Sequence, residues 1–438
     1  MKYEEYKDSG VEWIGEVPSH WEVKPIKRTG SFENGLTYSP TDICEGNGVL
    51  VLRSSNIQND KLSFEDNVYV TKCPSSLMVR PGDIIICSRN GSASLVGKCA
   101  MVEEDINASY GAFMMRYRPI CDSNKVFSFY LLQTALKCYK GLYSTTTINQ
   151  LTKGVIGQIY VSYPPLPEQQ AIATYLDEKC EKINTAIEVQ KKKIELLEEL
   201  KQSIITDAVT KGLNPNATMK DSGVEWIGEV PSHWEIMPLK SCGQFKKGVT
   251  FTKADIVEEG IPVISYGQIH AKNNTGTHLH EDLIRYIPNS FVKGSTISKV
   301  SKGDFIFADT SEDYEGCGNC VYIDMDYSLY GGYHTIVYKT KTQENKFLAY
   351  LFKTDCWRYQ IRSRVSGVKV FSITQSIISL CSVVLPPLSE QQAIAAHLDK
   401  ECEKIATQIS KANRRIELLE ELKQSIITEA VTGKIKVC

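Results

Sequence analysis

The sequence predicts an α+β fold in which two globular α/β domains are separated by a long antiparallel two-helix coiled coil, with an internal pseudo-two-fold repeat. Three observations predict this fold: long stretches of the sequence occur twice, each copy ends in a stretch with helical periodicity, and each copy contains a segment rich in short strand-like runs. The chain has 438 residues, more than one hydrophobic core usually serves, so at least two domains are expected.

The repeat is visible as matched sequence in three places. The first two matches are identical and the third differs at one residue: Lys7–Glu22 with Lys220–Glu235, Ile194–Thr206 with Ile416–Thr428, and 164–170 with 386–392. The matches occur in the same order in both halves, which indicates two copies of one unit. The predicted organisation is a globular domain with its opening motif followed by a helical spacer, twice in succession: 1–163, 164–213, 214–385 and 386–438.

The helical spacers carry the heptad pattern of a coiled coil. Residues 168–211 contain neither Gly nor Pro, Gly212 ends the run, and apolar residues recur at spacings of three and four. Because the second spacer repeats this seam, we expect the two helices to pair with each other in antiparallel fashion. Two unrelated surface helices are the alternative, which the identical seams disfavour. The predicted seam residues are Leu176, Ile183, Ile187, Ile194, Leu197, Ile204, Leu398, Ile405, Ile409, Ile416, Leu419 and Ile426.

The segments His20–Tyr163 and His233–Leu385, called the first and second modules, combine short strand-like runs with helical patches. Each contains a Gly-Asp pair followed by an apolar run, at 82–86 and 303–307, which is typical of a strand entered from a turn. Each module also has the size of one α+β domain. The matching runs indicate one scaffold used twice.

The two modules differ most in their polar residues. After matched strands, Arg53–Asn56 stands against Ser265–Gln268, and 88–91 stands against 309–312. Arg, Lys, Asn, Gln, Ser and Thr read base edges or hold phosphates, so one scaffold with two different DNA readers would produce this pattern. Neutral drift of surface residues would also produce it and remains the alternative. The candidate DNA-binding residues are Thr37, Arg53, Ser54, Asn56, Arg89, Asn90, Ser92, Thr147, Asn149, Lys153, Thr250, Tyr266, Gln268, His270, Lys272, Thr310, Ser311, Lys369 and Ser372.

The charge of the chain is unevenly distributed. Its 50 Lys and Arg against 52 Asp and Glu give a net charge of −2, which argues against binding of nucleic acid through overall basicity. The first module has 15 basic and 12 acidic residues and the second has 17 and 15, whereas the rest of the chain has 18 and 25. The basic balance therefore lies in the modules, although it is weak for nucleic-acid-binding domains, and Lys and Arg would have to gather on one face.

Signatures of catalysis and of metal binding are incomplete. Gly91–Cys99 resembles a phosphate-binding loop, but five residues separate its glycines instead of four, and Cys99 stands where Mg²⁺ requires Ser or Thr. Cys317 and Cys320 have the spacing of half a zinc site without a second pair, so a buried or turn cysteine is the favoured interpretation. We therefore expect a chain without catalysis, cofactor or metal of its own.

The remaining features indicate a cytoplasmic protein. No apolar run is long enough to span a membrane, and the N-terminus does not read as a signal peptide. The fourteen Cys fit no dense disulfide framework and are expected to be reduced. His20 and His233 lie in matched Pro-Ser-His-Trp segments, which we expect to be packed turns.

The arrangement of motifs resembles the specificity (S) subunit of Type I restriction–modification enzymes. The resemblance covers essentially the whole chain, and the repeated Ile-Glu-Leu-Leu-Glu-Glu-Leu-Lys helices carry it together with two further motifs: Gly-Glu-Val-Pro-Ser-His-Trp-Glu at 15–22 and 228–235, and Pro-Pro-Leu-Pro/Ser-Glu-Gln-Gln at 164–170 and 386–392. It implies that the modules are target recognition domains, each reading half of a bipartite, asymmetric DNA sequence, with the helices as a ruler between them.

The resemblance also implies partners. It implies that the chain binds double-stranded DNA and docks two adenine-modifying methyltransferase subunits, which bring S-adenosylmethionine, while a restriction and translocase subunit joins the full complex. No membrane partner is expected.

Two other functions remain open from the sequence. A protein-interaction scaffold built around the coiled coil need not bind duplex DNA, whereas a DNA reader should lose affinity steeply as salt rises. A self-sufficient enzyme with an unfamiliar site would methylate or cut DNA without partners.

Overall fold

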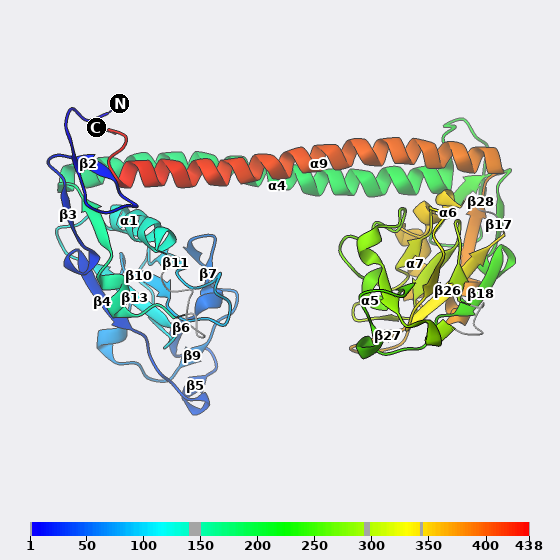
Figure 1. Ribbon diagram of the computed structural model, residues 1–438, viewed down its shortest axis with the longest axis horizontal. Helices are drawn as coiled ribbons and strands as arrows, with labels where there is room; N and C mark the ends of the chain where they lie inside the picture. The colour runs from blue at the N-terminus through cyan, green and yellow to red at the C-terminus, as the bar shows by residue number, and fades with distance from the viewer. Residues whose placement is uncertain (1, 140–149, 293–297, 342–344, 438) are drawn as a thin grey trace. The chain divides into compact units, whose positions relative to one another are not determined.

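The computed structural model describes residues 2–139, 150–292, 298–341 and 345–437, and Figure 1 shows their elements. The chain forms two compact units: Met1–Gln190 with Asn413–Cys438, and Lys191–Ala412. Each unit contains one module together with about half of each long helix, α4 (Leu166–Lys211) and α9 (Leu388–Val431). The prediction of an α+β fold with two mixed modules and two long paired helices is confirmed.

The described part of the first unit is built on two four-stranded sheets. One has the order β11-β10-β13-β4 and is antiparallel, and the other, β12-β6-β9-β5, contains the parallel pair β12 and β6. Shorter pairings join β1 to β2, β3 to β14 and β7 to β8. Apart from the long helices, the elements are β1 (Tyr6–Asp8), β2 (Glu16–Pro18), β3 (Glu22–Pro25), β4 (Gly30–Asn34), β5 (Ile43–Cys44), β6 (Val49–Leu52), β7 (Ile57–Gln58), β8 (Lys61–Leu62), β9 (Tyr69–Val70), β10 (Ile84–Cys87), β11 (Cys99–Met101), β12 (Ala108–Tyr110), β13 (Met114–Pro119), α1 (Lys125–Cys138), α3 (Lys153–Gly157) and β14 (Tyr160–Tyr163).

The second unit repeats this plan. Its sheets have the orders β18-β26-β22-β24 and β20-β19-β25-β21, and shorter pairings join β15 to β16, β17 to β28 and β23 to β27. Its elements are β15 (Met219–Asp221), β16 (Glu229–Pro231), β17 (Glu235–Pro238), β18 (Gly243–Lys247), β19 (Ile261–Ile264), α5 (Tyr266–Ile269), β20 (Arg285–Ile287), β21 (Lys299–Val300), β22 (Phe305–Ala308), β23 (Thr310–Ser311), β24 (Cys320–Tyr322), β25 (Leu329–Gly331), β26 (Thr335–Thr340), α6 (Lys346–Leu351), α7 (Asp355–Arg362), β27 (Phe371–Ser372), α8 (Gln375–Leu380) and β28 (Ser382–Leu385).

A central strand that is buried on both faces explains the apolar run after each Gly-Asp pair. Along β10, Ile84 and Ile86 pack into the core formed with α1 and the long helices, whereas Ile85 and Cys87 pack against the second sheet. Successive side chains of a strand point to opposite faces, so a strand between two layers must be apolar throughout. In the second unit β22 is likewise buried on both faces. Phe305 packs into the core formed with the helices, and Ile306 packs against the second sheet.

The two repeated motifs are joined to each other by Glu168. His20 Nε2 lies 2.6 Å from Glu168 Oε1, and the indole N–H of Trp21 donates to Oε2 over 3.0 Å. The Tyr3 hydroxyl donates to the same carboxylate over 2.8 Å. Trp21 is completely buried, so the predicted packed turn is confirmed. The opening motif and the Pro-Pro-Leu-x-Glu-Gln-Gln motif therefore form one joint between module and helix.

The second unit contains the same joint. Glu390 lies 2.8 Å from His233 Nε2 and accepts from the indole of the buried Trp234 over 3.2 Å. Because the motifs contact each other in both copies, a change in one would disturb the other. This contact gives a physical reason for both motifs to recur together.

The two long helices run antiparallel within each unit. In the first unit Leu176, near the start of α4, shares a core with Ile427, near the end of α9. In the second unit Ile205 and Leu398 do the same from the opposite ends. Six predicted seam residues are buried and six are partly buried: Leu176, Ile183, Ile187, Leu197, Leu398 and Ile405, and then Ile194, Ile204, Ile409, Ile416, Leu419 and Ile426. None of the described helices is long and apolar enough to cross a lipid bilayer.

Near the C-terminal ends of both helices the buried face moves by one residue from the predicted seam. Ile205 and Ile427 are almost completely buried, whereas their neighbours Ile204 and Ile426 are only partly so. A straight α-helix drifts by about 20° per heptad from a strict seven-residue repeat. The last turns of each helix also pack against a module, so the residues on the side that faces the module are buried.

Candidate nucleic-acid interface

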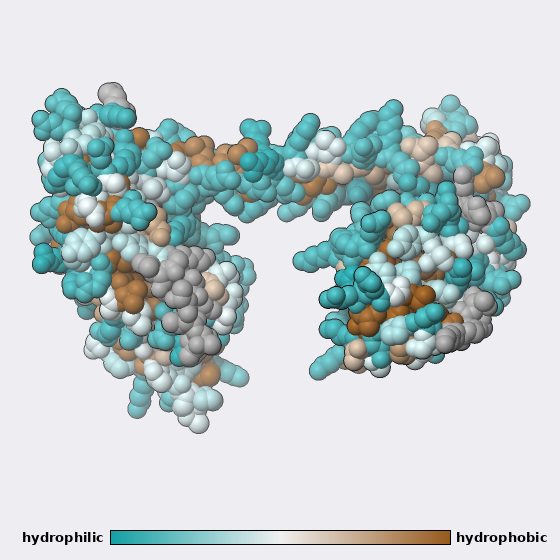
Figure 2. Space-filling view, in the orientation of Figure 1, coloured by the Kyte–Doolittle hydropathy of each residue, from teal (hydrophilic) through white to brown (hydrophobic). Residues whose placement is uncertain are grey.

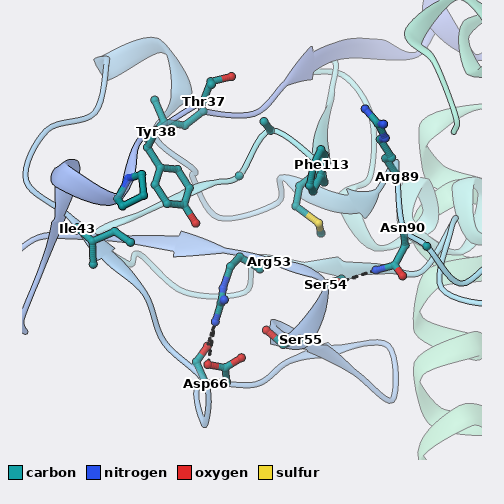
Figure 3. A pocket seen from close by; sticks show the side chains of 16 residues that line it. Thr37, Tyr38, Ile43, Arg53, Ser54, Ser55, Asp66, Arg89, Asn90 and Phe113 are labelled. Carbon is teal, nitrogen blue, oxygen red and sulfur yellow. Dashed lines mark hydrogen bonds and ion pairs between the residues drawn. The ribbon is translucent and has the colours of Figure 1, made fainter. Parts of the chain in front are cut away.

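The first module has a wide pocket that gathers five predicted DNA-binding residues. Its volume is about 1230 Å³, and its walls come mainly from the loops after β4, β6, β10 and β12, with Ile43 of β5 and Asp66 of the loop after β8. Figure 3 shows Tyr38 and Phe113 on two sides of the pocket, with polar side chains between them. The predicted residues that line it are Thr37, Arg53, Ser54, Arg89 and Asn90. Residues far apart in the sequence are thus brought to one surface.

A smaller pocket of about 440 Å³ adjoins the first one. It shares Arg89 and Phe113 with the larger pocket and adds Lys153, another predicted residue. Among the described residues that line the two pockets, Asp66 is the single carboxylate. Arg53, Arg89 and Lys153 line these pockets, although Arg53 is paired with Asp66 and Lys153 with Glu33, so the gathering of cations on one face stays a prediction.

The polar groups of the larger pocket are held in place by local contacts. Arg53 Nη2 lies 2.8 Å from Asp66 Oδ1, and hydrogen bonds from Ser55 and Arg53 with the nearby guanidinium charge lower the pKa of the Asp66 carboxyl. The Asn90 amide donates to Ser54 Oγ over 3.3 Å. Arg53 Nε is buried and has no hydrogen-bond partner among the residues described.

Asn56 has a different role from the predicted one. It is completely buried, its Oδ1 accepts from the backbone N–H of Arg53 over 2.9 Å, and its amide donates to the carbonyls of Ser63 and Asp66. The side chain holds the turn that presents Arg53 and Ser54. The prediction that Asn56 contacts DNA is therefore corrected to a supporting role.

The other predicted residues of the first module lie near the pocket or outside the described chain. Ser92 is exposed two residues after Asn90, and its backbone N–H donates to Asn90 Oδ1 over 3.0 Å. Lys153 is about half exposed and lies 3.3 Å from Glu33. Thr147 and Asn149 fall outside the described residues, so their predicted contacts stay predictions.

In the second module several predicted residues meet around the short pairing of β23 with β27. Thr310 pairs with Ser372 in this ladder, and His270 Nε2 lies 2.9 Å from the carbonyl oxygen of Thr310. The ring of Tyr266 lies 6.4 Å from that of His270 and 5.6 Å from that of His334. These side chains form the counterpart of the pocket surface in the first module.

Two predicted residues of this module are occupied by structural contacts. The Gln268 side chain accepts from the backbone N–H of Ser265 over 3.2 Å. It therefore caps its turn in the same way as Asn56 caps the equivalent turn of the first module. Ser311 is 1% exposed and donates to the carbonyl of Asp313 over 2.7 Å. Ser311 therefore supports the turn instead of facing a ligand, and its predicted role is corrected.

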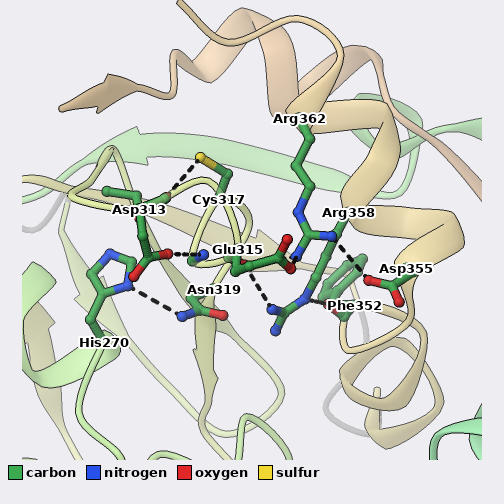
Figure 4. A network of polar contacts seen from close by, with 11 residues as sticks. His270, Asp313, Glu315, Cys317, Asn319, Phe352, Asp355, Arg358 and Arg362 are labelled. Atoms are coloured by element: carbon green, nitrogen blue, oxygen red, sulfur yellow. Dashed lines mark hydrogen bonds and ion pairs between the residues drawn. The ribbon is translucent and has the colours of Figure 1, made fainter. Parts of the chain in front are cut away.

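Thr250, Lys272 and Lys369 are exposed on loops of the second module. Figure 4 shows how the neighbouring loop is held: Asn319 Nδ2 lies 3.2 Å from His270 Nδ1, and Arg362 pairs with Glu315 over 2.7 Å. These contacts tie the loop after β23 to α5 on one side and α7 on the other.

The sequence reasoning missed one exposed ring on each surface, Phe113 in the first module and His334 in the second. Phe113 immediately precedes β13 and is 60% exposed, with the Arg89 guanidinium 5.3 Å from its ring centre. In the second module His334 stands immediately before β26 with a left-handed backbone at φ 54°. An exposed aromatic next to a matched strand was the available signal. Aromatic rings can stack on nucleobases, and cations beside them can contact the phosphates.

Comparison with known proteins identifies the family. A family model described as the Type I restriction modification DNA specificity domain matches residues 18–199 and 231–420. The chain is 24% identical to the Type I restriction enzyme MjaVIII specificity subunit of Methanocaldococcus jannaschii, over 96% of this chain and 94% of that one. It is 24% identical to the EcoKI specificity subunit of Escherichia coli K12, over 96% and 90%.

Two solved structures share the fold. A chain from a study of the complex assembly and conformational transition of the type I R-M system superposes with a TM-score of 0.69 at 16% identity, covering 96% of this chain and 99% of that one. The HsdS subunit from Thermoanaerobacter tengcongensis superposes with a TM-score of 0.50 at 17% identity, covering 96% and 98%.

Proposed function

The chain belongs to the family of Type I restriction–modification specificity subunits, and from this premise we propose that it reads a bipartite, asymmetric DNA target and docks methyltransferase subunits without catalysis of its own. The observation that carries the proposal is one scaffold with two different polar surfaces. Arg53 and Ser54 occupy the turn that Ser265 and Tyr266 occupy in the second module, and both turns have the same side-chain cap. Different side chains at equivalent places favour two different half-sites.

The long helices support a fixed spacing between half-sites. α4 runs for 46 residues, and one such helix measures about 69 Å at 1.5 Å per residue. Each module is anchored to the helices by the Glu168 or Glu390 joint. A stiff connection anchored at both modules would act as a ruler.

Exposed leucines on the helices support docking of two partner subunits. Leu196 and Leu200 on α4 are about half exposed, and so are the equivalent Leu418 and Leu422 on α9. Figure 2 shows hydrophobic residues at the surface of the long helices among mainly hydrophilic ones. Each pair lies in the repeated segment Ile-Glu-Leu-Leu-Glu-Glu-Leu-Lys, so two like partners would find two like surfaces.

The full proposal includes the partners that such a complex needs. Two methyltransferase subunits would bring S-adenosylmethionine, a restriction and translocase subunit would complete the complex, and the assembly would act on double-stranded DNA in the cytoplasm. This chain would supply the sequence reading.

Mapping of adenine methylation in a host that carries this chain with its methyltransferase subunit tests the proposal. We expect methylation at one split, asymmetric motif whose two halves are a constant distance apart. A matched host with the methyltransferase but without this chain should lack that motif. Absence of any new motif, or a single continuous one, would overturn the proposal, and duplex binding that does not weaken with salt would favour a protein scaffold.

A further inference from the structure

At the place in the second module that is equivalent to the pocket of the first module, aromatic rings stand. Backbone hydrogen bonds establish which residues are equivalent. In the first module the N–H of Leu36 donates to the carbonyl of Tyr110 over 2.7 Å, and in the second module the N–H of Val249 donates to the carbonyl of Gly331 over the same distance. Two residues further on, Ala112 lines the pocket and Tyr333 is its counterpart.

The rings of the second module pack on one another. The Tyr333 ring lies 5.6 Å from that of Tyr266, the counterpart of Ser54, and 5.0 Å from that of Phe251, the counterpart of Tyr38. Two small residues in the first module, Ala112 and Ser54, thus leave open the space that two tyrosines occupy in the second.

We propose that this pocket in the first module takes one unstacked nucleobase of the bound DNA, whereas the second module reads its half-site without such a pocket. The inference rests on the proposed DNA-reading function and names a ligand for one of its two surfaces. The chain would bind the base in this pocket and would not change it chemically.

The lining suits a nucleobase. Tyr38 and Phe113 offer aromatic rings on two sides of the pocket, and Arg53, Ser54 and Asn90 add hydrogen-bond donors and acceptors to its lining (Figure 3). A base that leaves its stack loses contacts with its neighbours, which aromatic side chains can replace because every base has a π face. Base edges are read by guanidinium and amide groups, and Arg53 and Asn90 supply one of each to the lining of the pocket.

The rims of the pocket suit the phosphates that flank a base. Arg89 lines both the larger pocket and the smaller one, and Lys153 lines the smaller one. The larger pocket, at about 1230 Å³, exceeds the roughly 300–1000 Å³ that holds a drug-sized ligand, so a base with its sugar fits. Asp66 is the one carboxylate among the described lining residues and is paired with Arg53.

The first experiment needs no knowledge of the target sequence. Saturation-transfer NMR of the full chain with dAMP, dCMP, dGMP and dTMP as separate probes should show contact with base protons for at least one nucleotide, with a dissociation constant on the order of a millimolar. Ala112→Tyr, which copies the second module, should weaken that binding at least about tenfold. Ala254→Tyr, at an exposed site of the second module, is the matched control, and circular dichroism should show that both variants fold.

Three outcomes would overturn the inference. These are no saturation of base protons in the wild-type chain, equal binding by Ala112→Tyr, and equal binding of deoxyribose 5-phosphate, which lacks a base. The last outcome would identify a phosphate or small-molecule site instead.

A second readout uses the mapped target with 2-aminopurine placed at each position of the two half-sites in turn. The full chain alone, without methyltransferase, should raise fluorescence at one position of one half-site, and Ala112→Tyr should abolish the rise. If the target is bound with constant fluorescence, the pocket inference fails and the DNA-reading function stands. If nucleotides bind but no duplex does, the pocket stands and the proposed function fails.

Discussion

Replacement of Glu168 by alanine should destabilise the joint between the first module and the helices. Trp21 is completely buried, so its indole N–H would lose its acceptor at a cost of about 1–3 kcal/mol. Loss of the Tyr3 hydrogen bond adds about 1 kcal/mol. The His20 side chain is 48% exposed, so solvent screening leaves little from that ion pair. We expect a total of about 2–4 kcal/mol.

This loss should be visible in the first unit alone. For a unit of roughly 200 residues, about 2–4 °C per kcal/mol gives a fall of about 4–16 °C in its unfolding midpoint. Because two units need not unfold together, hydrogen exchange read peptide by peptide is the suitable assay. Glu168→Gln keeps a carbonyl oxygen for Trp21 and should cost less than half as much. Glu390→Ala should instead affect the second unit, and unchanged protection of the first unit in Glu168→Ala, or equal loss in both, would refute the reasoning.

Three further predictions concern the Glu168 joint, the pocket of the first module and the exposed leucines of α4. Although burial raises it, hydrogen bonds from Trp21, His20 and Tyr3 lower the pKa of Glu168 overall. The part of its contribution that depends on ionisation is therefore present above about pH 4.5 and lost as the pH falls below that value. In urea titrations the difference between wild type and Glu168→Ala should narrow in acid, and a constant difference would contradict this. Arg53→Ala should relax discrimination by about 1–3 kcal/mol at one half-site, as measured with mismatched duplexes, and equal weakening at both halves would contradict modular reading. Leu196→Glu with Leu200→Glu should reduce docking from two methyltransferase subunits to one by native mass spectrometry, and two retained subunits would exclude this surface.

The repeated motifs predicted the framework well because each motif has a single physical role in both copies. The Gly-Asp pairs mark the same turn, with Gly82 and Gly303 both at φ 94°, and the apolar runs after them are the central strands. The Pro-Ser-His-Trp turns pack as predicted. Identity between copies thus served as a guide to structural roles.

The candidate site was harder to predict because polarity does not say which way a side chain faces. Asn56 and Ser311 look like ligand-binding residues in the sequence but cap turns in the interior. Ala112 is small and apolar, so nothing in the sequence marks it as a site residue. It stands out only because the strand register makes Tyr333 its counterpart in the second module. A pocket depends on small residues as well as on polar ones, and a small residue cannot be recognised as part of a pocket from the sequence alone.

The central strand of each module has a consequence for how such a chain can diversify. Ile84 and Ile86 serve the layer that holds Trp21 and the long helices, whereas Ile85 serves the layer beneath the loop of Arg53. The sheet therefore acts as a partition, and substitutions on its outer side can accumulate without loosening the anchor on its inner side. New binding preferences could arise by change in one layer while the attachment of the module to the rest of the chain is inherited intact.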